Sequence, residues 1–203
     1  MMPTRLRSSA SAAKACGGSR RQVERLLRVA DVGVAGLNVI EEGVPAIRLV
    51  HRAGDRTVPF SLERESFGTR AWLMSLPPLL SALGRGAVVA VDELDACLHP
   101  RMVAEIANMF ASPRSNPRGA QLVFTTHDVS LLGNLPVDRP LGRDEVWLTE
   151  KDDSGATELY PLTDLKPRKD ENLERGYLLG RYGAVPRVVT GQLARAVESG
   201  SVE

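Results

Sequence analysis

The chain has 203 residues, of which 43% are hydrophobic and 25% are charged, and its formal net charge is +1. That length can bury a sheet with helices on both faces, and no apolar run approaches the roughly 20 residues that span a bilayer. Two cysteines, Cys16 and Cys97, are too few for a disulfide framework or a metal knuckle. We therefore expect a soluble, globular α/β protein of the cytoplasm, with no membrane segment.

Positive charge is concentrated at the start of the chain. Residues 1–28 hold seven Arg or Lys against one acid, Glu24, a net of +6, so the rest of the chain carries about −5. Residues 1–20 contain no acid and much Ser, Ala, Gly and Arg, which predicts a disordered basic leader able to touch nucleic acid or an acidic partner. A misplaced start site or, third, an organellar transit peptide fits the same composition.

A small accessory lobe is expected next. Apolar residues in 22–32 have the spacing of an amphipathic helix. Residues 37–40 and 46–51 then predict two strands, with turn residues at 42–43 and 54–55.

Ser66 is a good N-cap for a helix predicted through residues 71–83. Gly68 and Thr69 lie in its first turn, where backbone N–H groups are open to an anion. Because Ser-x-Gly-Thr before a helix is also a common cap, this motif alone establishes no function.

Residues 87–91, AVVAV, predict a strand buried on both faces of a parallel sheet. Asp92 and Glu93 follow directly, and ligands bind beyond the carboxyl ends of such strands. Successive side chains point in different directions, so one carboxylate can hold a metal while the other faces a reacting water. The alternative is an acidic pair that only ends a core strand and caps the next helix.

A second strand is expected at the same sheet edge. Pro100 suits the first turn of a helix over 101–111, and residues 120–126 predict another buried strand that ends at His127. A right-handed strand–helix–strand unit directs both strand ends to one crevice. His127 is therefore expected near Glu93.

The last third predicts an antiparallel hairpin and a packing helix. Residues 144–151 and 158–162 alternate apolar and polar around an Asp-Asp-Ser-Gly turn, and we expect this pair to extend the sheet. A helix over 172–179 should stop at Gly180.

Several stretches in order resemble one family: ESFGTR, VVAVDELDACLHP and VFTTHD, supported by EVWLTEKDDSG and KDENLERGYLLGRYGAVP. Residues 20–187 look like the C-terminal part of bacterial AAA-type ATP-binding proteins with ABC-like heads. This group is met in phage-defence (abortive-infection) systems and is distantly similar to OLD-family and SMC-type ATPases.

The resemblance implies an α/β, three-layer P-loop NTPase-like (ABC-ATPase-like) partial fold. Its sheet would be mostly parallel, with an antiparallel edge hairpin and a small N-terminal accessory β segment. The implied organisation is a leader over 1–20, the C-terminal part of an ATPase domain over 21–190 and a tail over 191–203.

By the same resemblance, the ligands would be ATP and Mg²⁺. Asp92 would hold the magnesium ion through its water shell, Glu93 would orient or deprotonate the attacking water, and His127 would steady the γ-phosphate.

A second protein surface is also implied. Asp95 matches the D-loop, which contacts a facing subunit, and Ser66, Gly68 and Thr69 match the signature motif, which completes the partner's site. The implied partner is a second copy of the chain or a complementing ATPase subunit.

The sequence departs from the family because no G-x-x-x-x-G-K-[ST] occurs in it; Gly17 and Gly18 lack the Lys, the spacing and a preceding strand. In the family this loop lies N-terminal to the other motifs. We therefore expect ATP hydrolysis only with a missing segment or a partner chain, and poor ATP binding by this polypeptide alone.

Two other readings remain open. The chain could be a non-catalytic, degenerate head kept for dimerisation or regulation, or a truncated gene product. A weaker reading makes Asp92, Glu93 and Asp95 a metal-dependent nuclease cluster. Nucleic-acid binding is possible in any of these readings.

Overall fold

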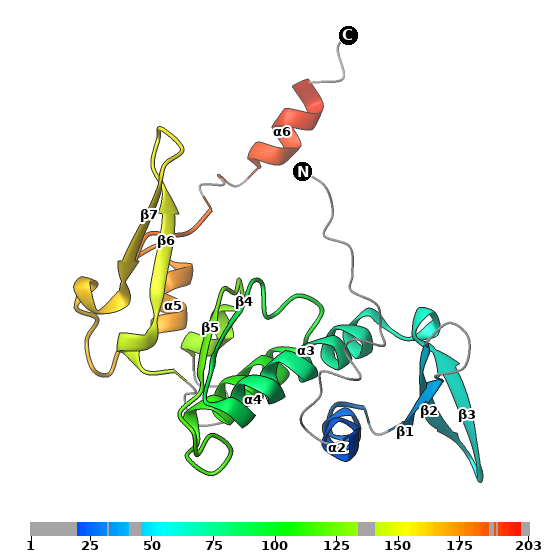
Figure 1. The fold of residues 1–203 in the computed structure, drawn as a ribbon. Helices are drawn as coiled ribbons and strands as arrows, with labels where there is room; N and C mark the ends of the chain where they lie inside the picture. The colour runs from blue at the N-terminus through cyan, green and yellow to red at the C-terminus, as the bar shows by residue number, and fades with distance from the viewer. Residues whose placement is uncertain are drawn as a thin grey trace. The chain divides into compact units, whose positions relative to one another are not determined.

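The computed structural model describes residues 20–31, 33–40, 46–133, 141–186, 189 and 191–199 (Figure 1). They form two compact units: one comprises the described residues up to Asp128, and the other comprises 129–133 and those from Leu141 onward. The expected leader, apart from Arg20, and the turn at 42–43 lie outside the described residues. Within these ranges, no helix is long and apolar enough to cross a membrane.

The first unit begins with the accessory lobe. Helix α2 (Arg20–Ala30) precedes an antiparallel sheet of β1 (Val34–Ile40), β2 (Ala46–Ala53) and β3 (Arg56–Ser61), in that spatial order. The expected helix and first two strands are confirmed. β3 was missed, because its first four residues are exposed and it contains a proline, so it lacks the alternation that marks a half-buried strand.

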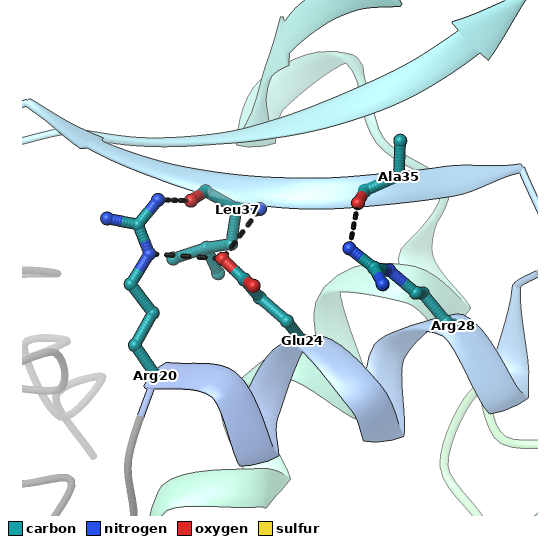
Figure 2. Close-up of polar contacts among 5 residues, drawn as sticks. All are labelled: Arg20, Glu24, Arg28, Ala35 and Leu37. Atoms are coloured by element: carbon teal, nitrogen blue, oxygen red, sulfur yellow. Dashed lines mark hydrogen bonds and ion pairs between the residues drawn. The ribbon is translucent and has the colours of Figure 1, made fainter.

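Charged side chains of α2 cover the outer edge of β1 (Figure 2). Arg20 and Arg28 donate to the carbonyl oxygens of Leu37 and Ala35, and the Leu37 N–H donates to Glu24 Oε1 at 3.4 Å. Arg20 Nε also donates to Glu24 Oε1 at 3.0 Å. Because the three side chains are four residues apart, they lie along one face of the helix and satisfy polar groups of an edge strand.

Helix α3 (Phe67–Arg85) follows the short 3-10 turn η1 (Leu62–Arg64). Its first residue lies four positions before the expected start, and Ser66 is its N-cap, as expected. The helix ends at Gly86, whose φ of 68° is left-handed and where a Cβ would lie 2.6 Å from the Arg118 carbonyl oxygen. Glycine is the residue that fits this position without strain.

A strand–helix–strand unit completes the first unit. β4 (Val88–Val91) and β5 (Gln121–Phe124) pair in parallel and are joined through α4 (Pro100–Ala111), with Pro100 in the first turn as expected. The prediction that the strand at 87–91 is buried on both faces is wrong, since Val88 is 63% exposed. The second strand was predicted to be buried, but its Val123 is 59% exposed. Helix α3 contacts β4 and helix α4 contacts β5. In each strand, half-buried residues alternate with exposed ones.

The second unit holds the expected hairpin. β6 (Trp147–Lys151) pairs antiparallel with β7 (Thr157–Pro161), and the Asp152 carboxylate accepts hydrogen bonds from the backbone of Ser154 and Ala156 in the turn. Among the described residues, β6 and β7 form a separate two-stranded sheet, so the expected extension of the β4–β5 sheet by the hairpin is not observed.

The core of the second unit lies between the hairpin and a short helix. α5 (Leu173–Leu178) is capped by the Asn172 side chain, and Leu148, Leu162, Leu173 and Tyr182 form the buried cluster. The remaining elements of this unit are η2 (Val129–Leu132), η3 (Arg143–Glu145), η4 (Leu162–Leu165) and the exposed helix α6 (Gln192–Ser199). The fold is thus mixed α/β with small parallel and antiparallel sheets, and β4–β5 is the one parallel pair in the described ranges.

Candidate active site

The ends of β4 and β5 are fastened together by Thr125. Its Oγ1 donates to Asp92 Oδ1 at 2.5 Å and accepts from the Glu93 N–H at 2.8 Å. The Leu94 N–H donates to the Thr125 carbonyl oxygen at 3.0 Å, which continues the strand pairing past the acidic pair. One hydroxyl therefore positions the side chain of Asp92 and the backbone of Glu93.

Thr125 was not among the residues expected in the site. Its position directly before Thr126-His127 could have indicated its role in the site, because a hydroxyl group at the end of a strand lies beside the end of the neighbouring parallel strand. Which of two successive threonines makes the contact depends on strand register, and the register pairs Val91 with Phe124.

Glu93 has an unusual backbone for its residue type. Its φ is 51°, in the left-handed region that costs a non-glycine residue free energy, and its side chain is exposed. Non-glycine residues held in this region are concentrated at functional sites. The hydrogen bond from its N–H to Thr125 is one contact that offsets this cost.

His127 is held to the loop that follows β4. Its backbone N–H donates to Asp95 Oδ1 at 3.3 Å, and Asp95 lies in a tight turn where the Ala96 N–H donates to the Glu93 carbonyl oxygen at 2.9 Å. The segments that carry Glu93 and His127 are therefore adjacent, as the parallel strand order predicted. One carboxylate oxygen of Asp95 therefore accepts a hydrogen bond from its own chain.

The turn that begins at Ser66, which precedes β4 in the chain, contacts the loop that follows β4. Ser66 Oγ accepts from the Thr69 N–H at 3.0 Å and lies 2.8 Å from Thr69 Oγ1. A Cβ on Gly68 would lie 2.9 Å from the Cys97 carbonyl oxygen, so the turn packs directly on the backbone of residues 92–98. The N-cap bond already uses the Thr69 N–H, which leaves those of Phe67 and Gly68 at the helix start for an anion.

The oxygen atoms at the strand ends fit a magnesium ion. Asp92 and Thr125 offer a carboxylate and a hydroxyl side by side, and Mg²⁺ in proteins takes one or two carboxylates together with phosphate oxygens and water. In the described part of the chain, no three His, Cys, Asp or Glu side chains gather into a metal-binding group. The nuclease hypothesis requires such a cluster of Asp92, Glu93 and Asp95. All three residues are described, and they do not form it.

One known protein family matches more than half of this chain. Residues 12–133 match the model of a family described as "AAA domain, putative AbiEii toxin, Type IV TA system". No curated protein gives a significant match to the chain.

Solved structures also match. One, from work on ATP-driven dimerization and DNA-stimulated activation of SMC ATPases, has a TM-score of 0.49 and 17% sequence identity, and the match covers 80% of this chain and 91% of that chain. Since the family match spans more than half of the chain, this protein belongs to that AAA-domain family of P-loop ATPases.

Proposed function

We propose that this chain is the hydrolytic part of an ATPase head, with Asp92, Glu93 and His127 acting on bound ATP. The observation that carries the proposal is the joining of loops 92–98 and 125–128 at the carboxyl ends of β4 and β5, through Thr125 and Asp95. That end of a parallel pair is where α/β proteins bind their ligands.

Each side chain has a separate task in the proposed reaction. Glu93 orients the attacking water and accepts its proton, and His127 donates a hydrogen bond to the transferred phosphoryl group. Asp92, oriented by Thr125, would hold Mg²⁺ through its water shell, and the ion would supply positive charge to the reaction. A polar group placed where charge develops commonly contributes about 10²-fold to 10³-fold in rate.

Asp95, Ser66, Gly68 and Thr69 belong to a second surface in this proposal. They face another subunit, either a second copy of the chain or a complementing ATPase chain, whose nucleotide they help to enclose. The packing of Gly68 on the Cys97 carbonyl supports one continuous surface, because it joins the Ser66 turn to the loop that carries Asp95.

The proposed head needs another polypeptide segment to bind ATP tightly. The 203 residues contain no G-x-x-x-x-G-K-[ST], so nothing in this sequence supplies the lysine and glycine-rich loop that cradle the β- and γ-phosphates. With this segment added, the head would have the three-layer fold typical of P-loop ATPases.

Complementation tests the proposal. The chain is co-expressed with the strand, phosphate loop and first helix of a homologous AAA-domain ATPase, and Mg²⁺-dependent ATP hydrolysis is measured. Glu93→Gln should lower the rate at least about 100-fold. Glu105→Gln, at an exposed position of α4, is the matched control and should leave the rate unchanged. An inactive mixture, or an active Glu93→Gln variant, contradicts the proposal.

The absent phosphate loop also favours a second candidate, a non-catalytic head that dimerises or regulates. This candidate predicts a stable fold whose Tm does not change with ATP and Mg²⁺, alone or with the complementing segment. A nucleotide-dependent rise in Tm would exclude it.

A further inference from the structure

His51 of the accessory lobe and Glu65 at the start of α3 form a hydrogen-bonded pair that is largely shielded from water. His51 Nε2 lies 2.8 Å from Glu65 Oε1, and the two side chains are 17% and 5% exposed. A carboxylate removed from water to this extent needs a hydrogen-bond donor, and the imidazole N–H supplies one. The pair therefore ties the lobe to the residue that precedes the N-cap of α3.

The sheet of the lobe holds the imidazole in place. His51 lies on the central strand β2, opposite Val34 of β1 and Val58 of β3. Its ring lies against the Phe60 ring, with the ring centroids 5.2 Å apart. Leu49, two positions before His51 and on the same face of the strand, is fully buried. The Nε2 atom is thus presented to Glu65 from a packed and hydrogen-bonded support.

Glu65 determines how the chain enters α3. It directly precedes the N-cap Ser66, and its own N–H donates to the Leu62 carbonyl oxygen at 3.2 Å. A side chain fixed at the position before an N-cap sets the angle at which the chain enters the helix. Because Gly68 packs on the Cys97 carbonyl oxygen, the Ser66 turn is held at two points, by the lobe and by the loop after β4.

We propose that His51, acting through Glu65, is a positioning residue for the Ser66 turn. This turn belongs to the surface that, in the proposed function, helps to enclose the nucleotide of a facing subunit, so the functional part of the inference rests on that proposal. A displacement of about 1 Å at groups that position a substrate can cost about 10²-fold in rate. The accessory lobe thus contributes to hydrolysis in the facing subunit without contacting its nucleotide.

Amide hydrogen exchange in the full chain, without nucleotide, tests the positioning step. The Thr69 and Arg70 N–H groups donate to Ser66 Oγ and to the Ser66 carbonyl oxygen, so they report on the turn. His51→Leu keeps an apolar group against Phe60 but has no donor, and both amides should exchange about tenfold faster or more, because a hydrogen bond to a charged group is lost. His51→Gln keeps an N–H donor and should restore most of the protection.

Further variants separate a local effect from a global one. Glu65→Ala breaks the same contact without leaving a buried charge and should accelerate the same two amides. Arg52→Ala, at the exposed next position of β2, is the matched control and should leave them unchanged. The Gln121 N–H, which donates to the Ala87 carbonyl oxygen at 3.1 Å, should keep its exchange rate in every variant.

Three results would overturn the inference. They are unchanged turn amides in both His51→Leu and Glu65→Ala, a lack of rescue by His51→Gln, and an equal acceleration of the Gln121 amide, which would mean that the pair only stabilises the fold.

Heterodimers of the complemented ATPase, isolated with two different affinity tags, test the functional step. With His51→Leu and Glu93→Gln in the same chain, the intact Glu93 of the unmodified partner faces the altered turn. With the two substitutions in different chains, the intact Glu93 faces an unaltered turn, and hydrolysis should be about tenfold faster or more than in the first heterodimer. Equal rates would overturn the action on the facing subunit. If the unmodified complemented chain hydrolyses no ATP, the proposed function fails, and the exchange rates still decide whether His51 positions the turn.

Discussion

Thr125 Oγ1 donates a hydrogen bond to Asp92 Oδ1 at 2.5 Å, across 33 positions of the sequence. The same oxygen accepts from the Glu93 N–H, so one hydroxyl links the proposed magnesium ligand with the proposed catalytic base. Thr125 is a positioning residue in this arrangement, because it acts through Asp92 and Glu93.

Removal of this hydroxyl should impair hydrolysis more than binding. In the complemented ATPase, Thr125→Val keeps the side-chain shape but breaks both contacts. Because a hydrogen bond to a charged group is worth about 1.5–3 kcal/mol, we expect kcat to fall by about 10-fold to 100-fold and the Mg²⁺ requirement to rise. Thr125→Ser keeps the hydroxyl and should retain most of the activity. Equal kcat values and equal Mg²⁺ dependence for the two variants would show that the hydroxyl does not position the site.

The contact between Gly68 and Cys97 predicts opposite effects at two glycines of α3. Gly68→Ala places a methyl group against the Cys97 carbonyl oxygen and should destabilise the chain by about 1–3 kcal/mol. Gly84→Ala lies in the same helix with nothing within 4 Å of its new Cβ, and should stabilise the chain by about 0.5–1 kcal/mol. Urea unfolding measures both, and a neutral Gly68→Ala would contradict the close packing of the two turns.

The covered edge of β1 predicts a difference between two arginines of α2. Arg28→Ala removes the donor to the Ala35 carbonyl oxygen and should destabilise the lobe by about 0.5–1.5 kcal/mol. Arg25, exposed on the same helix, makes no such contact to the sheet within the described residues, and Arg25→Ala should change stability by less than about 0.5 kcal/mol. Amide hydrogen exchange of β1 reports the change, and equal exchange rates in both variants would contradict this role of Arg28.

The hairpin turn should lose stability in acid. The Ser154 hydroxyl and then the Ala156 N–H donate to Asp152 and lower the pKa of its carboxyl below the usual value. Because the folded pKa lies below the unfolded one, the contribution is present above the unfolded value of about 3.9 and is lost as the pH falls through the folded pKa.

Two variants check this titration. Asp152→Asn keeps an oxygen acceptor but cannot titrate, so the acid-induced fall in the Tm of the hairpin unit should be smaller than in the unmodified chain. Asp170→Asn, at an exposed turn position elsewhere in the second unit, should keep the full pH dependence. The idea fails if the two variants lose stability in parallel as the pH falls.

Local signals in the sequence determined the ends of elements and the order of the motifs. The Ser66 and Asn172 caps, Pro100 in a first turn, the Asp152 turn and the acidic pair after β4 each depend on residues a few positions apart, where backbone geometry limits the choices. The ordered motifs also indicated the family that the comparison then matched.

Tertiary structure alone decided the rest. The contacts of Thr125 with Asp92 and of Gly68 with Cys97 join residues some thirty positions apart. The left-handed backbone of Glu93 and the exposure of Val88 and Val123 in β4–β5 follow from how segments pack. A run such as AVVAV is apolar enough to be buried on both faces, but its burial depends on which elements cover it. Periodicity describes what a strand can bury, and only packing decides what it does bury.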